Sequence, residues 1–326
     1  MVKAVIIKMH DSYGRSIDYL RISVTDRCNL RCIYCMPETK QTFLPEKELL
    51  TIEEWVRFCK GAAMAGIRKI RITGGEPLMR KDILLLVNEL TQIQGIQQVV
   101  MTSNGIHLAS MARKLHNAGL SGVNVSIDSL NRESYYQLTG QDRLQEVLDG
   151  LHTCGEIGLP LKVNCVPVSG KNEDTLWELI DLARTHAIEI RFIEMMPIGA
   201  GTGFDPIPNT DILRQLEHSF GTWTQIQRND LDGPAVTYTN PAFFGKIGFI
   251  SPVSQRFCPA CNRIRMTADG KLKLCLHHPA QADMRAILRQ QGTPEEINDF
   301  LYQIIQKKPQ NGHQTEETRP MWRIGG

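Results

Sequence analysis

Six short runs of β-branched and apolar residues recur along the first 194 residues, and this recurrence constrains the fold more than any other feature. The runs cover residues 19–25, 69–73, 98–102, 122–127, 161–166 and 188–194. Between them lie segments with the apolar spacing of amphipathic helices, among them residues 51–66, which begin with Thr51 and Glu54 at capping-box spacing. Strands that alternate with helices predict a parallel sheet with right-handed crossovers.

Polar residues gather directly after the predicted strands. A cysteine cluster follows the first strand, GGEP (residues 74–77) follows the second, and TSNG (residues 102–105) follows the third. In α/β barrels the active site lies at the carboxyl ends of the strands. Six repeats instead of eight predict an α/β fold, an incomplete (βα)6 TIM-type barrel; a doubly wound sheet with a switch-point crevice is the alternative.

The alternation stops after about residue 200, where residues 199–209 are rich in glycine and proline and have the composition of a connector. We therefore predict two units. The partial barrel spans residues 1–235, and a smaller C-terminal α+β region spans residues 236–326 and covers the open side of the barrel.

The composition argues against several kinds of partner. The chain has 326 residues and a net charge of +2, so it lacks the excess of positive charge that predicts binding to nucleic acid or to an anionic membrane. No segment approaches the roughly 18 consecutive apolar residues of a membrane span. The N-terminal residues lack the pattern of a secretion signal. We therefore expect a cytoplasmic protein with neither nucleic acid nor membrane as a partner.

Nine cysteines fall into two groups of three and three single positions. A secreted disulfide framework would need pairs and an export signal, so clusters at these spacings favour metal binding. The single cysteines lie in apolar surroundings, and we predict that they are packed core thiols. They are Cys59, Cys154 and Cys165.

The first group has the spacing C-x3-C-x2-C and consists of Cys28, Cys32 and Cys35. Zinc is one interpretation, but a closed zinc site needs four ligands, and no obvious fourth ligand lies nearby in the sequence. An iron–sulfur cluster held by three thiolates instead leaves one iron free to bind a small molecule. The spacing, the aromatic Tyr34 before the last cysteine and the GGEP segment resemble the signature of the radical S-adenosylmethionine superfamily.

The second group has the spacing C-x2-C-x13-C and consists of Cys258, Cys261 and Cys275. His277 and His278 follow closely, so a structural zinc site of three cysteines and one histidine is an alternative. Arg263 and Arg265 alternate on a predicted strand and therefore place two guanidinium groups on one face. A structural zinc site has no use for them, whereas a ligand with phosphate groups does.

Five segments extend the resemblance almost from end to end. They are GRSIDYLRISVTDRCNLRCIYCMP, KIRITGGEPLMR, RFIEMMPIG, CNRIRMTADGKLKLCL and the terminal IGG. With these segments the chain resembles the GTP 3′,8-cyclase family, also called molybdenum cofactor biosynthesis protein A. The resemblance implies a lyase that uses S-adenosylmethionine and two [4Fe–4S] clusters. Its reaction would cyclise GTP to (8S)-3′,8-cyclo-7,8-dihydroguanosine 5′-triphosphate, the first step of molybdenum cofactor (molybdopterin) biosynthesis.

The resemblance also implies roles for individual residues. The first cysteine group would hold the cluster that binds S-adenosylmethionine, with cofactor contacts from Tyr34, Gly75, Ser126 and Met196. The second group would hold the cluster that binds GTP, with substrate contacts from Arg21, Arg71, Thr102, Lys162, Arg263, Ile264 and Arg265, and with Lys69 and Arg191 as further phosphate-facing charges. The two terminal residues, Gly325 and Gly326, would take part in catalysis.

Elementary electrostatics favours a phosphate-bearing substrate without the resemblance. Five basic residues lie in or beside the predicted strands, namely Arg21, Lys69, Arg71, Lys162 and Arg191. Unpaired charge in a buried sheet is costly, so five such residues near one mouth of the barrel favour a ligand with several negative charges.

The expected partners are GTP as substrate, an electron donor and a possible homodimer. Two rival interpretations remain open on the sequence. The first is another radical S-adenosylmethionine enzyme with an auxiliary cluster, such as a peptide-modifying maturase. The second is a zinc-binding module without catalysis.

We expect Cys32→Ala to abolish cleavage of S-adenosylmethionine, because the first cluster would lose a ligand that it has no means to replace. The measurement is 5′-deoxyadenosine formation under anaerobic conditions with GTP and a reductant. Retained formation of 5′-deoxyadenosine would contradict the assignment of this cysteine group.

Overall fold

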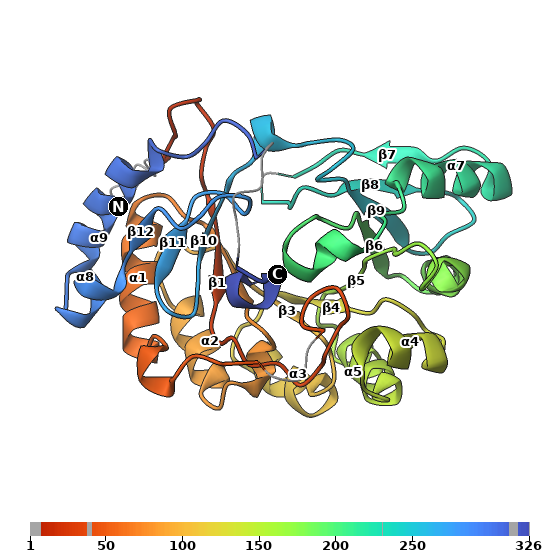
Figure 1. The fold of residues 1–326 in the computed structure, drawn as a ribbon, viewed down its shortest axis with the longest axis horizontal. Helices are drawn as coiled ribbons and strands as arrows, with labels where there is room; N and C mark the ends of the chain where they lie inside the picture. The colour runs from red at the N-terminus through yellow and green to blue at the C-terminus, as the bar shows by residue number, and fades with distance from the viewer. Residues whose placement is uncertain (1–7, 38–40, 230, 313–318, 326) are drawn as a thin grey trace.

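The computed structural model describes residues 8–37, 41–229, 231–312 and 319–325. Its helices lie mainly outside one large curved sheet (Figure 1). The described strands are β1 (Tyr19–Ser23), β2 (Lys69–Thr73), β3 (Gln98–Ser103), β4 (Gly122–Ser126), β5 (Leu161–Cys165), β6 (Glu189–Ile193), β7 (Thr224–Ile226), β8 (Val236–Thr239), β9 (Lys246–Ile250), β10 (Arg263–Met266), β11 (Lys271–Lys273) and β12 (Ala282–Asp283). The described α-helices are α1 (Ile52–Met64), α2 (Ile83–Thr91), α3 (Leu108–Asn117), α4 (Arg132–Thr139), α5 (Leu144–Glu156), α6 (Leu176–Thr185), α7 (Asn209–Phe220), α8 (Arg285–Arg289), α9 (Pro294–Ile305) and α10 (Met321–Ile324). Short 3-10 helices are η1 (Glu46–Glu48), η2 (Pro77–Met79), η3 (Glu173–Thr175), η4 (Gly199–Gly203) and η5 (Cys258–Ala260).

The strands form a single open sheet in the order β12-β11-β10-β1-β2-β3-β4-β5-β6-β9-β8-β7. Strands β1 to β6 follow one another in sequence order and pair in parallel. A doubly wound sheet would reverse its strand order at a switch point. The observed order therefore confirms the partial barrel and excludes the doubly wound alternative. Strands β12 and β7 are its edges, and no pairing among the described residues joins them.

Two further parallel strands come from the C-terminal part of the chain. The predicted strand with Arg263 and Arg265 is one of them, β10, but the repeat pattern of the sequence does not reveal that β9 and β10 extend this sheet. β10 pairs with β1 and β9 pairs with β6, so the parallel part of the sheet has eight strands. Neither strand follows a regular helical crossover. β9 pairs antiparallel with the preceding β8, and β10 follows the loop that carries Cys258 and Cys261. Both predicted units contribute to one sheet, and the division at residue 235 stays a prediction.

Alternation along β1, β2 and β10 separates polar from apolar side chains. Their sequences are YLRIS, KIRIT and RIRM. Successive side chains of a strand point to opposite faces. On one face, Leu20, Ile70 and Ile264 are fully buried in the hydrophobic core. The arginine side chains of all three strands point the other way and line the interior of the barrel, which is therefore positively charged on this side.

Helix α1 joins the first repeat to the C-terminal region. Thr51 and Glu54 form the predicted capping box at its start, and this box satisfies N–H groups that the first turn leaves without helical partners. The helix packs against α9 so closely that a Cβ at Gly61 would lie 2.6 Å from the Cβ of Ile297. Glycine at this position therefore permits the close approach of the two helices.

The three single cysteines are core residues. Cys59 in α1, Cys154 in α5 and Cys165 in β5 are free thiols with 0% exposure. They pack in the main hydrophobic cluster, which also contains Trp55 and Phe58. The prediction that they are packed thiols is confirmed.

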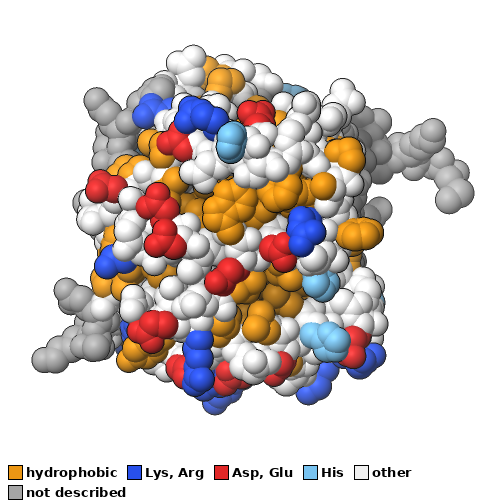
Figure 2. Space-filling view, turned by 90° about the vertical axis from the view of Figure 1, so that its right-hand side faces the viewer, with side chains coloured by type: hydrophobic (Ala, Val, Ile, Leu, Met, Phe, Trp, Pro, Cys, Tyr) orange, Lys and Arg blue, Asp and Glu red, His pale blue; other side chains and the backbone are white. Residues whose placement is uncertain are grey.

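The end of the molecule that carries α7 faces the viewer in Figure 2. Acidic and basic side chains are interspersed on this face, and hydrophobic side chains lie exposed between them. Large exposed apolar residues of the chain include Phe244, at 80% exposure, and Trp177 on α6, at 38%. In the part of the chain that the structure describes, no helix is both long and apolar enough to cross a bilayer.

Candidate active site

The first cysteine loop follows β1 and rests on the glycines that follow β2. The backbone N–H of Gly75 donates to the carbonyl of Thr25 at 2.7 Å. A Cβ at Gly75 would lie 2.3 Å from the carbonyl oxygen of Arg27, one residue before Cys28. The glycines of GGEP therefore let the β2 end support the backbone of the cysteine loop, a role that the sequence analysis did not identify.

Two buried carboxylates hold this end of the barrel together. The Tyr34 hydroxyl donates to Oδ2 of Asp128 at 2.5 Å, which links the cysteine loop to the end of β4. Glu76 accepts hydrogen bonds from the Ser103 hydroxyl at 2.8 Å and from the Asn104 backbone at 2.7 Å. Burial raises the pKa of Asp128 to about 6 and that of Glu76 to about 7. The sequence contained a signal for both, since Asp128 directly follows one predicted strand and Glu76 belongs to the GGEP segment that follows another.

The second cysteine group lies at the opposite end of the barrel. Cys258 and Cys261 precede β10, and Cys275 follows the antiparallel β11, whereas the first group follows β1. Because β10 runs parallel to β1, the two groups belong to opposite ends of the strands. All six thiols line one cavity of about 360 Å³. The structure thus places the six cysteines around a single cavity.

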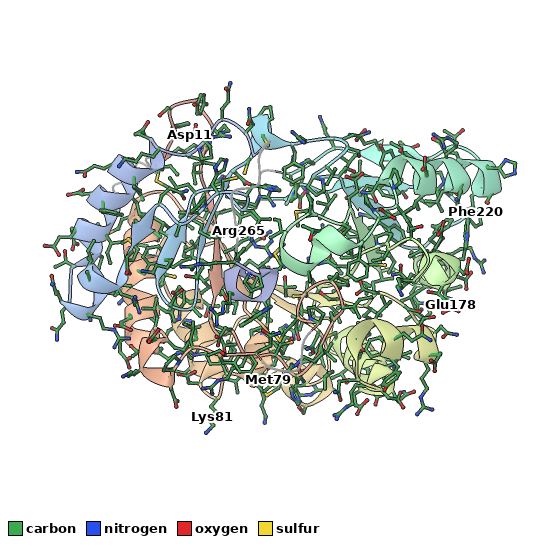
Figure 3. All side chains as sticks on the ribbon, in the orientation of Figure 1. Asp11, Met79, Lys81, Glu178, Phe220 and Arg265 are labelled. Atoms are coloured by element: carbon green, nitrogen blue, oxygen red, sulfur yellow. The ribbon has the colours of Figure 1, made fainter. Side chains whose placement is uncertain are left out.

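A row of arginines lies between the two cysteine groups. Arg265, Arg21 and Arg71 occupy equivalent positions on the adjacent strands β10, β1 and β2, and Figure 3 places Arg265 near the centre of the molecule. Adjacent strands lie about 4.8 Å apart. Burial and then the charge of Arg265 lower the pKa of Arg21, and burial lowers the pKa of Arg265 to about 10. Like charges on adjacent strands are destabilising, so this row is suited to an anion with several charges.

Tyr19 orients one of these arginines, and the sequence analysis missed it. Its hydroxyl accepts a hydrogen bond from Nε of Arg71, and Lys69 lies over its ring, with Nζ 5.4 Å from the ring centroid. Burial opposes ionisation of Tyr19, but the charges of Arg71, Arg21 and Lys69 outweigh burial and lower its pKa to about 7. Its place on the same strand face as Arg21 was the available signal.

The two cysteine groups have different electrostatic surroundings. Burial raises the pKa of Cys28 to about 11 and that of Cys35 to about 12. Burial acts in the same direction on Cys261, but the charges of Arg263 and Lys308 outweigh it and lower the pKa to about 6. The second group therefore lies on the positively charged side of the cavity, which stabilises thiolates.

Most of the site residues expected from the sequence line this cavity. Besides the cysteines, these residues are Arg21, Tyr34, Arg71, Gly75, Thr102, Ser126, Arg191, Met196, Arg263 and Arg265. Three of the other expected cofactor and substrate contacts do not line it. Lys69 donates to the carbonyl of Leu231 at 2.8 Å, and Ile264 is buried in the core on the opposite strand face. Lys162 forms an ion pair of 2.7 Å with Glu189.

Glu189 forms ion pairs with two of the expected basic residues, Lys162 and Arg191. It accepts from Nζ of Lys162 at 2.7 Å and from Nε of Arg191 at 2.5 Å. Burial raises its pKa, but the charges of Arg191 and Lys162 outweigh burial, so the net pKa is lowered. Positive charge on this wall of the barrel is therefore partly balanced, in contrast to the arginine row.

The C-terminal tail enters the barrel. The carbonyl of Gly325 accepts a hydrogen bond of 3.0 Å from Nη1 of Arg265. Gly325 has a φ of +90°, and a Cβ there would lie 2.7 Å from Oγ1 of Thr73 at the end of β2. Both the conformation and the close approach require glycine. Gly326, the other expected catalytic residue, lies outside the described residues.

The donor sets fit iron–sulfur clusters better than single metal ions. All six cysteines are free and partly buried, with three in each group. Three thiolates that bind one zinc ion must each approach it to about 2.3 Å. Among the described residues, no three His, Cys, Asp or Glu side chains are arranged to hold a single ion. A set of three cysteine thiolates suits a cluster with one open iron position.

Family models cover most of the chain. Residues 22–183 match the model of the radical SAM superfamily, and residues 188–314 match that of the molybdenum cofactor synthesis C domain. A GTP 3′,8-cyclase of Thermodesulfovibrio yellowstonii is 41% identical over 323 residues, which is 98% of this chain and 100% of that protein. A GTP 3′,8-cyclase of Peptoclostridium acidaminophilum is 40% identical, over 97% of this chain and 98% of that protein. This chain belongs to the GTP 3′,8-cyclase family.

A member of this family is a radical S-adenosylmethionine enzyme whose cofactors are S-adenosylmethionine and two [4Fe–4S] clusters. The fold agrees with a solved structure of SuiB from Streptococcus suis bound to S-adenosylmethionine, with a TM-score of 0.58. At 15% identity, over 87% of this chain and 68% of that chain, the likeness concerns the fold alone. Relatives that match over nearly the full length exclude the two rival interpretations of the sequence.

We expect Gly75→Ala to displace the first cysteine loop, because the added Cβ would lie 2.3 Å from the carbonyl oxygen of Arg27. Iron bound to the anaerobically purified protein should fall by up to about half, with loss of the signal of one cluster. The control is Gly155→Ala, since a Cβ at Gly155 meets no atom within 4 Å. Full iron content and normal cleavage of S-adenosylmethionine in Gly75→Ala would show that the loop tolerates displacement.

Proposed function

We propose that this chain converts GTP to (8S)-3′,8-cyclo-7,8-dihydroguanosine 5′-triphosphate at the cavity between its two cysteine groups, as the first step of molybdenum cofactor biosynthesis. The observation that carries this assignment is the row of Arg265, Arg21 and Arg71, which lines the cavity between the groups. A nucleoside triphosphate supplies the several negative charges that such a row needs, whereas a neutral peptide does not.

We assign the first cluster to Cys28, Cys32 and Cys35 and the second to Cys258, Cys261 and Cys275. Bound S-adenosylmethionine and its cluster supply a hydrogen-abstracting radical, and the product joins C3′ of the ribose to C8 of the guanine. The chain's own task is to hold both ligands in contact and to exclude water from the reacting atoms.

The arginine row binds and orients the triphosphate in this proposal. Arg71 is held on two sides, because its Nε donates to Tyr19 and its Nη1 donates to the Thr102 hydroxyl at 3.0 Å. A guanidinium with fixed orientation loses little entropy when it binds phosphate. Lys162 and Arg191, which form ion pairs with Glu189, contribute positive charge from β5 and β6. Lys69, which lies over the ring of Tyr19, contributes a further positive charge.

S-adenosylmethionine is assigned to the end of the cavity near the first cysteine loop. Tyr34 and Gly75 belong to that end, and Ser126 lies at the end of β4. Met196 lines the same cavity beside Met195 and Ile198, so this part of the wall is apolar. An apolar wall excludes water without competing for the polar groups of the ligands.

Three further assignments belong to this proposal. An electron donor would supply the electron on which the chemistry of the first cluster depends. A possible homodimer and a cytoplasmic location complete the proposal. The division into a barrel of residues 1–235 and a C-terminal region of residues 236–326 follows the change in sequence pattern.

The test of the function is anaerobic incubation of the reconstituted protein with GTP, S-adenosylmethionine and a reductant. We expect 5′-deoxyadenosine and a cyclised GTP isomer in equal amounts, because one hydrogen abstraction accompanies each cyclisation. Mass spectrometry identifies the nucleotide, and ATP in place of GTP is the control for base selectivity. Formation of 5′-deoxyadenosine with unchanged GTP would contradict the proposed substrate.

We expect removal of Gly325 and Gly326 to stop cyclisation while both clusters and GTP binding are kept, because the tail contributes backbone and not metal ligands. Gly325→Ala should have a similar effect, since its Cβ would lie 2.7 Å from Oγ1 of Thr73. Gly158→Ala is the control, because Gly158 also has a positive φ but meets no atom within 4 Å. Turnover, iron content and GTP affinity are measured for each variant. Normal turnover of the truncated protein would show that the tail has no part in catalysis.

A further inference from the structure

Two buried cations lie behind the second cysteine group, and neither belongs to the expected site. Arg15 lies in the loop before β1, and Lys308 follows α9. Arg15 is 8% exposed and Lys308 is 2% exposed, and neither lines the cavity. A buried charge is costly unless hydrogen bonds or an opposite charge compensate it. The contacts of these two residues therefore indicate what they stabilise.

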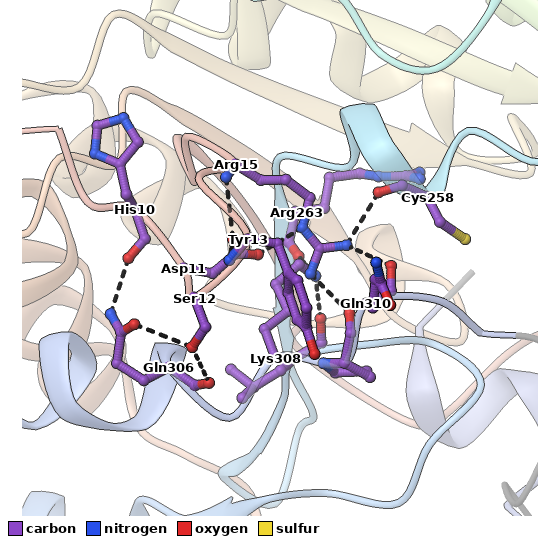
Figure 4. Close-up of polar contacts among 12 residues, drawn as sticks. His10, Asp11, Ser12, Tyr13, Arg15, Cys258, Arg263, Gln306, Lys308 and Gln310 are labelled. Atoms are coloured by element: carbon purple, nitrogen blue, oxygen red, sulfur yellow. Dashed lines mark hydrogen bonds and ion pairs between the residues drawn. The ribbon is translucent and has the colours of Figure 1, made fainter.

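Arg15 uses its whole guanidinium to connect three segments (Figure 4). Nη1 donates to the carbonyl of Cys258 at 3.0 Å and to that of Gln310 at 2.9 Å. Nη2 donates to the carbonyl of Pro309 at 2.7 Å, and Nε donates to Asp11 at 2.6 Å. Arg15 thus ties the first cysteine of the group to the chain just after Lys308.

Lys308 reaches the other two cysteines of the group. Its Nζ donates to the carbonyl of Arg263 at 2.8 Å, two residues after Cys261. It also donates to the carbonyl of Leu274, directly before Cys275. Each of the three cysteine-bearing segments therefore has a backbone carbonyl held by Arg15 or Lys308.

The loop that carries Arg15 is itself fastened to the end of α9. The Ser12 hydroxyl donates to the carbonyl of Gln306 at 2.6 Å, and the Gln306 amide donates to the carbonyl of His10 at 2.9 Å. These contacts lie beside Arg15 and Lys308 (Figure 4). Residues 10–15 and residues 306–310 are therefore bonded to each other as well as to the cysteine segments.

The two cations differ in the charge that they present to the cluster. Arg15 forms an ion pair with Asp11, whose side chain is fully buried, so the charge of Arg15 is balanced. Lys308 forms no ion pair with a described residue, and the groups of opposite charge that act on it most are Cys261 and Cys275. Among the described residues, Lys308 therefore directs its charge at the second group without an acidic partner.

We propose that Arg15 and Lys308 are positioning residues for the second cluster, and that the charge of Lys308 also raises the reduction potential of this cluster. Net charge and hydrogen bonding around the sulfurs are the main protein influences on such potentials. The inference rests on the second cluster of the proposed function and extends that function by naming residues outside the cavity that govern the cluster.

The experiment compares four anaerobically reconstituted variants of the full chain with the wild type. Lys308→Met removes the charge with little change in volume, Lys308→Arg keeps the charge, and Arg15→Lys keeps the charge but loses the planar set of donors. Lys307→Met is the control, because Lys307 is the exposed neighbour of Lys308. Iron content, the unfolding midpoint and the midpoint potential of each cluster by EPR-monitored titration are measured.

We expect Lys308→Met to keep the first cluster unchanged and to make reduction of the second about tenfold less favourable, which is about 59 mV for a one-electron couple. Lys308→Arg should restore most of this shift. Arg15→Lys should lower occupancy of the second cluster, and iron content should then fall by up to about half. Lys307→Met should match the wild type. If Lys308→Met loses the second cluster altogether, its retention in Lys308→Arg supports the role of the charge.

An unchanged potential of the second cluster in Lys308→Met would overturn the electrostatic part of the proposal. Full iron content in Arg15→Lys would overturn the positioning part. Equal losses in Lys308→Met and Lys307→Met would show a general loss of stability instead. Failure of the proposed function gives a different pattern, since the wild-type protein would then contain two clusters with the expected response to these substitutions but would not consume GTP.

Discussion

The concentration of positive charge inside the barrel is the constraint on which the rest of the structure depends. Arg265, Arg21 and Arg71 share one register across three adjacent strands. Arg265 and Arg71 are buried, and Arg21 between them is half-buried. Such a row is unfavourable in an empty interior and becomes favourable with a polyanionic ligand. The apolar residues that alternate with these arginines bind the sheet to its helices, so fold and charge are encoded in the same strands.

Segments near the N-terminus and the C-terminus contact the barrel at both ends of its strands. The tail beyond α10 brings Gly325 to the carboxyl ends of β1 and β2, where Arg265 binds its carbonyl. The loop at Arg15 and the segment at Lys308 support the second cysteine group at the amino end of β10. These segments therefore supply contacts at both ends of the strands of a sheet that stays open.

Much of the fold could be predicted because its signals are local. The six central strands, the capping box at Thr51 and the core position of Cys59 each follow from a few neighbouring residues. The alternation of Arg263 and Arg265 predicted a strand where β10 lies, but no local signal showed that β10 and β9 join the sheet, because each pairs with a distant partner. The candidate site shows the same division. The cysteines and arginines stand out by type and spacing, whereas Tyr19, Asp128 and Glu189 depend on neighbours that only the folded chain supplies.

The sequence by itself determined the strand periodicity, the spacing of the two cysteine groups and the alternation of arginine with isoleucine, because each is a relation between residues close together in the chain. The tertiary structure alone decided that the cysteine groups lie at opposite ends of one cavity and that two buried cations support the second group. Arg15 contacts Cys258 across 243 positions and Gln310 across 295. A buried guanidinium donates hydrogen bonds to the carbonyl groups that packing brings close to it. No local sequence pattern specifies which carbonyl groups those are.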